Sequence, residues 1–117
     1  EGYGAVCAVE TTAIPSDELT VEEFRVSSGQ GVQLIDVREP WERALGHLES
    51  SVHVPLGSLG TDEAHRALAG LDPHRATVVY CAGGVRSLKA LPALRREHRF
   101  SSVKSLRGGF TAWKSSA

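Results

Sequence analysis

The stretch Thr77-Val78-Val79-Tyr80-Cys81-Ala82-Gly83-Gly84-Val85-Arg86 decides how the rest of this sequence is interpreted. It begins with a continuous run of β-branched and aromatic residues, which is typical of a buried strand. A cysteine ends the run, two glycines follow, and residues 86–98 have a helical pattern. This order predicts a cysteine at the carboxyl end of a strand, with its side chain at the N-terminus of a helix.

Segments that resemble strands and helices alternate on both sides of this stretch. The alternation predicts an α/β fold with a mainly parallel sheet. Pro92 lies inside the last predicted helix and removes one hydrogen bond, so we expect a kink or an early break there. The expected strands are 33–37, 52–54, 77–80 and 102–106. The expected helices are 20–29, opened by a Thr20 capping box, 41–45 after Pro40, 61–69, capped by Thr61, and 86–98.

Length and composition indicate one ordinary globular domain. The chain has 117 residues, a net charge of -1 and no apolar run of membrane-spanning length, so neither nucleic acid nor a membrane is an expected partner. It contains no methionine, and we expect it to be excised from a longer protein, with residues 1–16 as a tether and residues 17–117 as the domain.

The two cysteines, Cys7 and Cys81, are too few for a disulfide framework. We expect reduced thiols in a cytoplasmic protein, although a single disulfide between them stays open. The histidines show no metal-ligand spacing, so no metal site is expected; they are His47, His53, His65, His74 and His98.

The surroundings predicted for Cys81 suit a reactive thiolate. Glycines permit positive φ and let the loop turn its N–H groups toward one point, and the following helix adds a partial positive charge. Both effects lower the pKa of a thiol, and the thiolate is the nucleophile. Most isolated cysteines are small core residues, but the order of strand, cysteine, glycines, arginine and helix favours a functional role for Cys81.

The length of the loop separates two reaction classes. Four residues lie between Cys81 and Arg86. A spacer one residue longer would form the phosphatase arrangement, which is wide enough for a tetrahedral phosphate. The shorter spacer favours transfer of a single sulfur atom, while a phosphatase-like enzyme and a non-enzymatic interaction module stay open as alternatives.

Four motifs in order resemble the rhodanese family: residues 34–39, residues 46–55, the Cys81 loop, and residues 106–109 with Trp113. The resemblance covers Leu19 to Trp113. It implies a five-stranded parallel sheet flanked by helices on both sides. It also implies a sulfurtransferase that takes a sulfane sulfur onto the cysteine as a persulfide and passes it to an acceptor.

The family motifs assign roles to individual positions of this chain. Cys81 would carry the persulfide, and residues 82–86, which are Ala82, Gly83, Gly84, Val85 and Arg86, would form the loop whose amides face it. Asp36 and Arg38 match a structural Asp-x-Arg. Gly46 and His47 match a Gly-His for which packing is expected, and Trp113 is expected in the core.

The chain departs from the family pattern at three places, one of which is Pro92 in the helix after the loop. Ser50-Ser51 stands where the family often has Gly-Ala, and we expect these serines to be tolerated on a loop. Ala82 and Gly83 are uncharged where members specialised for thiosulfate tend to carry basic residues. Thiosulfate is therefore in doubt as the physiological donor, although Arg86 is left to attract an anion.

Residues 3–7 resemble the end of the adenylating domain in fused proteins that activate ubiquitin-like sulfur carriers. This resemblance implies a preceding adenylating domain and, as the acceptor, the adenylated C-terminus of a sulfur carrier protein. The donor would be thiosulfate or the persulfide of a cysteine desulfurase. No cofactor is expected in this domain, and ATP and any zinc would be bound only by the missing domain. A stand-alone thiosulfate sulfurtransferase is the alternative.

Overall fold

A computed structural model describes residues 17–116 of the chain. The expected tether, residues 1–16, lies outside the described residues, and so do Cys7 and the segment that resembles an adenylating domain. The strands are β2 (Glu18–Leu19), β3 (Gln33–Asp36), β4 (Ser51–His53), β5 (Thr77–Tyr80) and β6 (Val103–Leu106). The helices are α1 (Val21–Ser28), α2 (Pro40–Ala44), the 3-10 helix η3 (Leu56–Ser58), α3 (Asp62–Leu68), α4 (Val85–Arg96) and α5 (Gly109–Ser115).

The strands form one five-stranded sheet in the order β2-β6-β5-β3-β4, and every neighbouring pair is parallel. This confirms the predicted fold. The connection from β3 leads to one edge of the sheet and the connection from β5 leads toward the other. Ligands of open parallel sheets bind where the connections diverge in this way, at the carboxyl ends of the strands.

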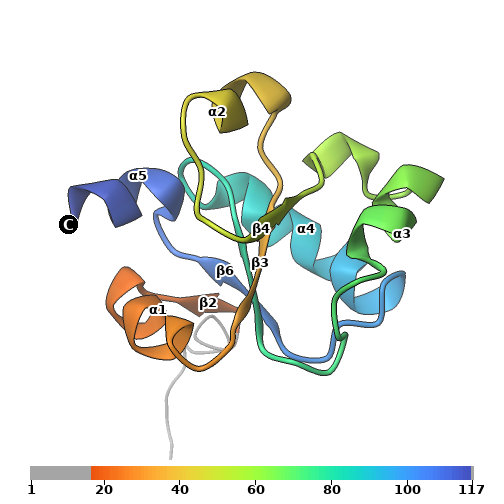
Figure 1. Cartoon of the computed structure of the whole chain (residues 1–117), viewed down its shortest axis with the longest axis horizontal. Coiled ribbons are helices and arrows are strands. Elements are labelled where there is room, and N and C mark those ends of the chain that lie inside the picture. Colours follow the sequence, from red (N-terminus) through yellow and green to blue (C-terminus); the bar gives the residue numbers. More distant parts are fainter. Residues whose placement is uncertain (1–16, 117) are drawn as a thin grey trace, which may run out of the picture.

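Helices cover both faces of the sheet, and each face has its own core (Figure 1). Alternate residues of β5 point to opposite faces, as the strand geometry requires. Val79 and Cys81 belong to the core with α3 and α4, whereas Val78 and Tyr80 belong to the core with α1 and α5. A single strand therefore sends Cys81 and Tyr80 to opposite sides of the sheet.

The caps expected from the sequence form as predicted. The Thr20 side chain accepts from the Glu23 N–H at 3.1 Å, and the Glu23 carboxylate accepts from the Thr20 N–H at 2.8 Å, which completes the capping box of α1. Thr61 caps α3 by accepting from the Ala64 N–H at 3.2 Å. The sequence analysis missed β2 and η3, which contain two and three residues and are too short for a periodic pattern. It also did not predict the helix α5.

Of the two outcomes expected at Pro92, a kink or an early break of α4, the early break does not occur. The helix continues through Pro92 to Arg96. Pro92 is exposed, and so is Leu88, whose carbonyl loses its partner. Because water can hydrogen-bond that carbonyl, the proline causes no break.

The longest described helix, α4, has 12 residues, and no helix within residues 17–116 is long and apolar enough to cross a membrane.

The expectation that Ser50 and Ser51 lie together on a tolerant loop is half wrong. Ser51 is the first residue of β4 and is buried at 8% exposure. Ser50 is exposed and has a φ of +66°, in the left-handed region that favours glycine. The second serine is therefore part of the packed structure, and the first carries backbone strain.

Replacing Ser50 with glycine should stabilise the protein. The left-handed conformation costs a residue with a Cβ about 1–2 kcal/mol, which the greater unfolded-state freedom of glycine offsets in part. We expect a gain of about 0.5–1 kcal/mol in the free energy of unfolding, measured by urea denaturation. Ser28→Gly, in the last turn of α1, is the control and should lower that free energy; a loss in Ser50→Gly as well would contradict the prediction.

Candidate active site

Cys81 follows the carboxyl end of the central strand β5 and is 1% exposed. Its sulfur accepts hydrogen bonds from the Gly84 N–H at 3.1 Å and from the Ser87 N–H at 3.4 Å. The Ser87 hydroxyl lies 3.5 Å from the same sulfur. The structure confirms the predicted position of Cys81, between the end of a strand and the start of a helix. Because Cys81 is almost fully buried, a co-reactant can reach its sulfur only with an atom that fits inside the loop.

The surroundings of Cys81 lower its pKa. Burial alone would raise the pKa of the thiol, because a thiolate loses its hydration. The Ser87 side chain and the backbone N–H groups of Ser87, Gly84 and Gly83 donate hydrogen bonds that outweigh burial and bring the pKa below its ordinary value of 9.0. The loop therefore favours the nucleophilic form of the sulfur.

Only one of the two loop glycines needs to be glycine for the backbone. Gly84 has a φ of +100°, and a Cβ at that position would lie 3.0 Å from the Gly108 nitrogen. Gly83 has open space around its Cα and a φ outside the left-handed region. The tight turn that aims the Gly84 N–H at Cys81 therefore depends on Gly84.

The glycines of residues 106–109 support the cysteine loop from behind. Gly109 has a φ of +61°, and a Cβ there would overlap the carbonyl groups of Cys81 and Ala82. The next two residues of α5 hold these carbonyls: the Phe110 N–H donates to the Cys81 oxygen at 2.8 Å and the Thr111 N–H to the Ala82 oxygen at 3.0 Å. The C-terminal motif thus shapes the site by backbone packing.

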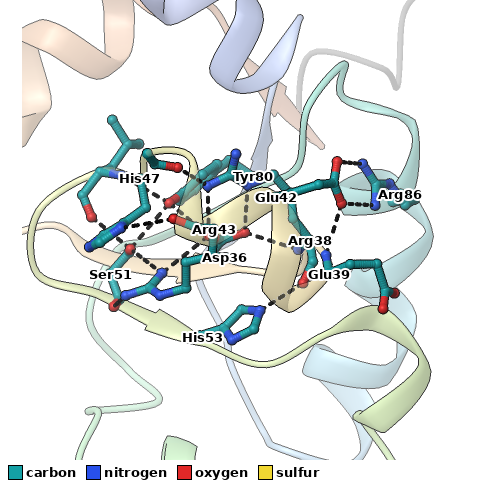
Figure 2. A network of polar contacts seen from close by, with 12 residues as sticks. Asp36, Arg38, Glu39, Glu42, Arg43, His47, Ser51, His53, Tyr80 and Arg86 are labelled. Atoms are coloured by element: carbon teal, nitrogen blue, oxygen red, sulfur yellow. Dashed lines mark hydrogen bonds and ion pairs between the residues drawn. The ribbon is translucent and has the colours of Figure 1, made fainter.

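Asp36 is the centre of a buried polar network on the other face of the sheet (Figure 2). The Arg38 guanidinium donates to both carboxylate oxygens of Asp36 at 3.0 Å, and Arg43 and the Tyr80 hydroxyl each donate at 3.1 Å. Burial would raise the pKa of Asp36, but the hydrogen bonds and charge of Arg38 outweigh it and lower the pKa. These contacts agree with the predicted structural role of Asp36 and Arg38.

The network also fixes the segment around α2. Arg38 donates to the Gly46 carbonyl at 2.7 Å, and the Arg38 carbonyl lies 2.7 Å from the His53 ring. Arg43 donates to the Ser51 hydroxyl and to the Ser51 carbonyl, both at 2.9 Å. The chain from β3 to β4 is therefore held at both ends and in the middle.

His47 does not pack as expected. Its side chain is exposed, and its ring nitrogen lies 3.4 Å from the Arg43 carbonyl. The preceding residue, Gly46, has the structural contact instead, because its carbonyl accepts from Arg38. The packing role expected for the Gly-His pair thus belongs to the glycine.

Trp113, expected in the core, is partly buried and stacks on Phe110 with ring centroids 5.7 Å apart.

Arg86 is not free to attract an anion, so this expectation from the sequence is wrong. Its guanidinium donates to both carboxylate oxygens of Glu42, at 2.7 and 2.8 Å (Figure 2). The pairing lowers the pKa of Glu42 to about 2 and raises that of Arg86. The sequence could not show this contact, because 44 positions separate the two residues.

Ser87 is a residue of the site that the sequence analysis missed. It is fully buried and lies directly after the quoted loop. Its hydroxyl lies 2.7 Å from the hydroxyl of Ser105, which is also fully buried, on β6. A small polar residue in the first turn of the helix, facing the cysteine, was the available signal.

Among residues 17–116, no group of three or more His, Cys, Asp or Glu side chains could hold a metal ion.

Comparison with known proteins shows which family this chain resembles. A family model for the rhodanese-like domain matches residues 20–116. The probable adenylyltransferase/sulfurtransferase MoeZ of Mycobacterium tuberculosis is 35% identical over 112 residues, which are 94% of this chain and 28% of that protein. The chain thus spans little more than a quarter of this relative.

Two further proteins cover the domain alone. The thiosulfate sulfurtransferase GlpE of Pseudomonas paraeruginosa is 34% identical over 94 residues, 80% of either chain. The structure of the human single-domain sulfurtransferase TSTD1 superimposes with a TM-score of 0.71 over 86% of this chain and 96% of that one. At 22% identity, it supports the fold alone.

Removing the Ser87 hydroxyl should make Cys81 less reactive at neutral pH. Alkylation by iodoacetamide requires the thiolate, so its rate rises as the pH passes upward through the thiol pKa. Ser87→Ala loses a donor that lowers this pKa, so the pH midpoint should move upward. At pH values below the midpoint, the rate should fall roughly threefold to tenfold, the effect of a hydrogen bond worth about 1 kcal/mol.

Ser105→Ala is the matched control, because it breaks the same pair of hydroxyls and leaves the donor that faces Cys81 in place. It should lower stability without moving the midpoint upward. An unchanged midpoint in Ser87→Ala would contradict the role given to this hydroxyl.

Proposed function

Because the chain belongs to the rhodanese-like domain family, we propose that it is a sulfurtransferase whose Cys81 carries a sulfane sulfur as a persulfide. The predicted enzyme class, a sulfurtransferase, agrees with relatives named for that activity. One observation of the site supports Cys81 most strongly: backbone N–H groups of the loop and the Ser87 side chain converge on its sulfur and lower its pKa.

The proposed reaction has two steps. The Cys81 thiolate attacks the outer sulfur of the donor, the donor's bond to that sulfur breaks, and its electron pair leaves with sulfite from thiosulfate or with a thiolate from a desulfurase persulfide. A nucleophilic acceptor, such as cyanide or a thiolate, then attacks the outer sulfur of the Cys81 persulfide, and the Cys81 thiolate leaves. The donors that stabilise the thiolate would also stabilise the anionic persulfide.

Exposure of the protein to thiosulfate should add one sulfur atom, and intact-mass measurement can detect it. The adduct should be absent in Cys81→Ala and should disappear when cyanide is added as acceptor. Cys7→Ala is the matched control, since it removes the other cysteine of the chain. A Cys81→Ala protein that still gains the sulfur would refute the assignment.

We propose further that the acceptor is the adenylated C-terminus of a ubiquitin-like sulfur carrier, and that the product is a thiocarboxylate. Because an acyl adenylate is an electrophile, the outer sulfur of the Cys81 persulfide would attack its acyl carbon and AMP would leave. A thiol would then cleave the resulting acyl disulfide, which releases the thiocarboxylate and leaves Cys81 in a disulfide with that thiol. The name of the mycobacterial relative, which joins adenylyltransferase to sulfurtransferase, supports this proposal. ATP, and any zinc, would belong to an adenylating domain in the same protein. The GlpE relative favours a stand-alone thiosulfate sulfurtransferase as the second candidate. These relatives do not favour a phosphatase-like or a non-enzymatic role.

Exposed apolar side chains beside the cysteine loop also suit a protein acceptor. Trp41 on α2 is 66% exposed, Leu45, the residue after α2, is 80% exposed, and Val85 at the start of α4 is 63% exposed. The Glu42–Arg86 pair joins α2 to the first turn of α4, so the two segments that carry these side chains meet beside the loop. Large exposed apolar residues close to a reactive group are typical of a docking surface.

Trp41→Ala should therefore weaken the reaction with a carrier protein. We expect the carrier concentration that gives half-maximal thiocarboxylate formation, measured by mass spectrometry with an adenylated ubiquitin-like carrier, to rise about tenfold, as for an interface tryptophan. Val26→Ala is the control, because Val26 is 74% exposed on α1. Equal effects of the two substitutions would argue against docking at α2.

A further inference from the structure

The strongest ion pair near Cys81 lies across the point where the sheet connections diverge. Glu42 is on α2, which follows β3, and Arg86 is in the first turn of α4, which follows β5. Two hydrogen bonds of 2.7 and 2.8 Å join them. The Glu42 side chain is 12% exposed and that of Arg86 is 33% exposed. This bidentate geometry is the strongest form of an arginine–carboxylate contact.

Glu42 is held in place independently of Arg86. The Glu39 N–H donates to its carboxylate at 2.9 Å, in the capping box of α2. The same helix carries Arg43, which is bound to Asp36 and Ser51. Because α2 is anchored on its other side, the carboxylate cannot move away from Arg86 without breaking the cap.

The pair changes the charge that a sulfur donor meets. Ala82, Gly83, Gly84 and Val85 carry no charge, so Arg86 is the charged residue of the loop. Glu42 neutralises it. Glu42 also stays ionised at all but strongly acidic pH, since its pKa lies at about 2. A dianion that enters the loop therefore meets hydrogen-bond donors but no net positive charge, and it must give up its hydration without that compensation.

We propose that Glu42 is a specificity-determining residue: by occupying Arg86, it disfavours free dianionic donors such as thiosulfate and favours donors that bring the sulfane sulfur as a persulfide on cysteine. This inference rests on the proposed function of Cys81 and specifies its donor class. The chemistry at Cys81 is the same for both donors, and they differ in the leaving group, which is sulfite for thiosulfate and a thiolate for a persulfide.

Replacing Glu42 with glutamine tests the proposal directly. The amide removes the negative charge and keeps the size of the side chain, so Arg86 regains a net charge toward the loop. We expect the second-order rate constant for loading Cys81 from thiosulfate to rise about tenfold, and the rise to shrink at high ionic strength. Loading from cysteine persulfide, measured the same way, should change less than about threefold.

Asp17→Asn is the matched control, since it removes a carboxylate that pairs with another arginine of α4. Asp17 contacts Arg95 at 2.7 Å, about 14 Å along the helix from Arg86. It should leave the ratio of thiosulfate to persulfide rates unchanged. If Glu42→Gln fails to fold, Glu42→Ala, which also removes the charge, carries the same expectation.

The possible failures can be told apart. A thiosulfate rate that is unchanged or lower in a folded Glu42 variant would overturn the role of Glu42, and so would an equal gain with both donors. If no donor loads sulfur onto Cys81 in the wild-type protein, the proposed function fails and the inference about Glu42 falls with it.

Discussion

The buried carboxylate of Asp36 constrains more of this structure than any other single group. It is fully buried, and a buried charge is strongly destabilising unless charged and polar groups compensate it. Here Arg38, Arg43 and the Tyr80 hydroxyl all donate to it. These partners come from the loop after β3, from α2 and from β5, so satisfying one carboxylate brings three parts of the chain together (Figure 2).

The same network reaches toward the C-terminus of the chain. The Arg38 guanidinium lies over the Phe110 ring at 4.6 Å and over the Tyr80 ring at 5.4 Å. Phe110 belongs to α5, whose first turn holds the Cys81 carbonyl. The face of the sheet that contains Asp36 thus contacts the cysteine loop through Arg38 and α5, although Asp36 and Cys81 point to opposite sides.

The position of α2 has consequences for chemistry as well as for packing. Arg43 anchors the helix to the Asp36 network, and Glu42, its neighbour, faces Arg86 at the cysteine loop. A loop that would otherwise have one positive charge is left with oriented N–H and O–H donors. Such a site stabilises a thiolate or a persulfide through hydrogen bonds, which act on an anion already inside the loop, and adds little long-range attraction for anions in solution.

Much of the fold could be predicted from local patterns. The capping box at Thr20, the apolar runs and the order of strands and helices placed most elements to within one or two residues, because caps and periodicity are properties of neighbouring residues. The errors arose where solvent or distant partners decide. Pro92 is tolerated because its face of α4 is exposed. Ser51 is buried because its hydroxyl forms hydrogen bonds with Arg43 and Tyr80.

The sequence by itself determined the α/β class, the place of Cys81 at the end of a strand and the glycine-containing turn after it. These depend on residue types and spacings within a few positions. Only the tertiary structure decided which of the two loop glycines the turn requires, that Gly109 must leave room for the loop and that Arg86 is neutralised. Ion pairs and close backbone contacts between residues many positions apart are set by packing, and no local pattern encodes them.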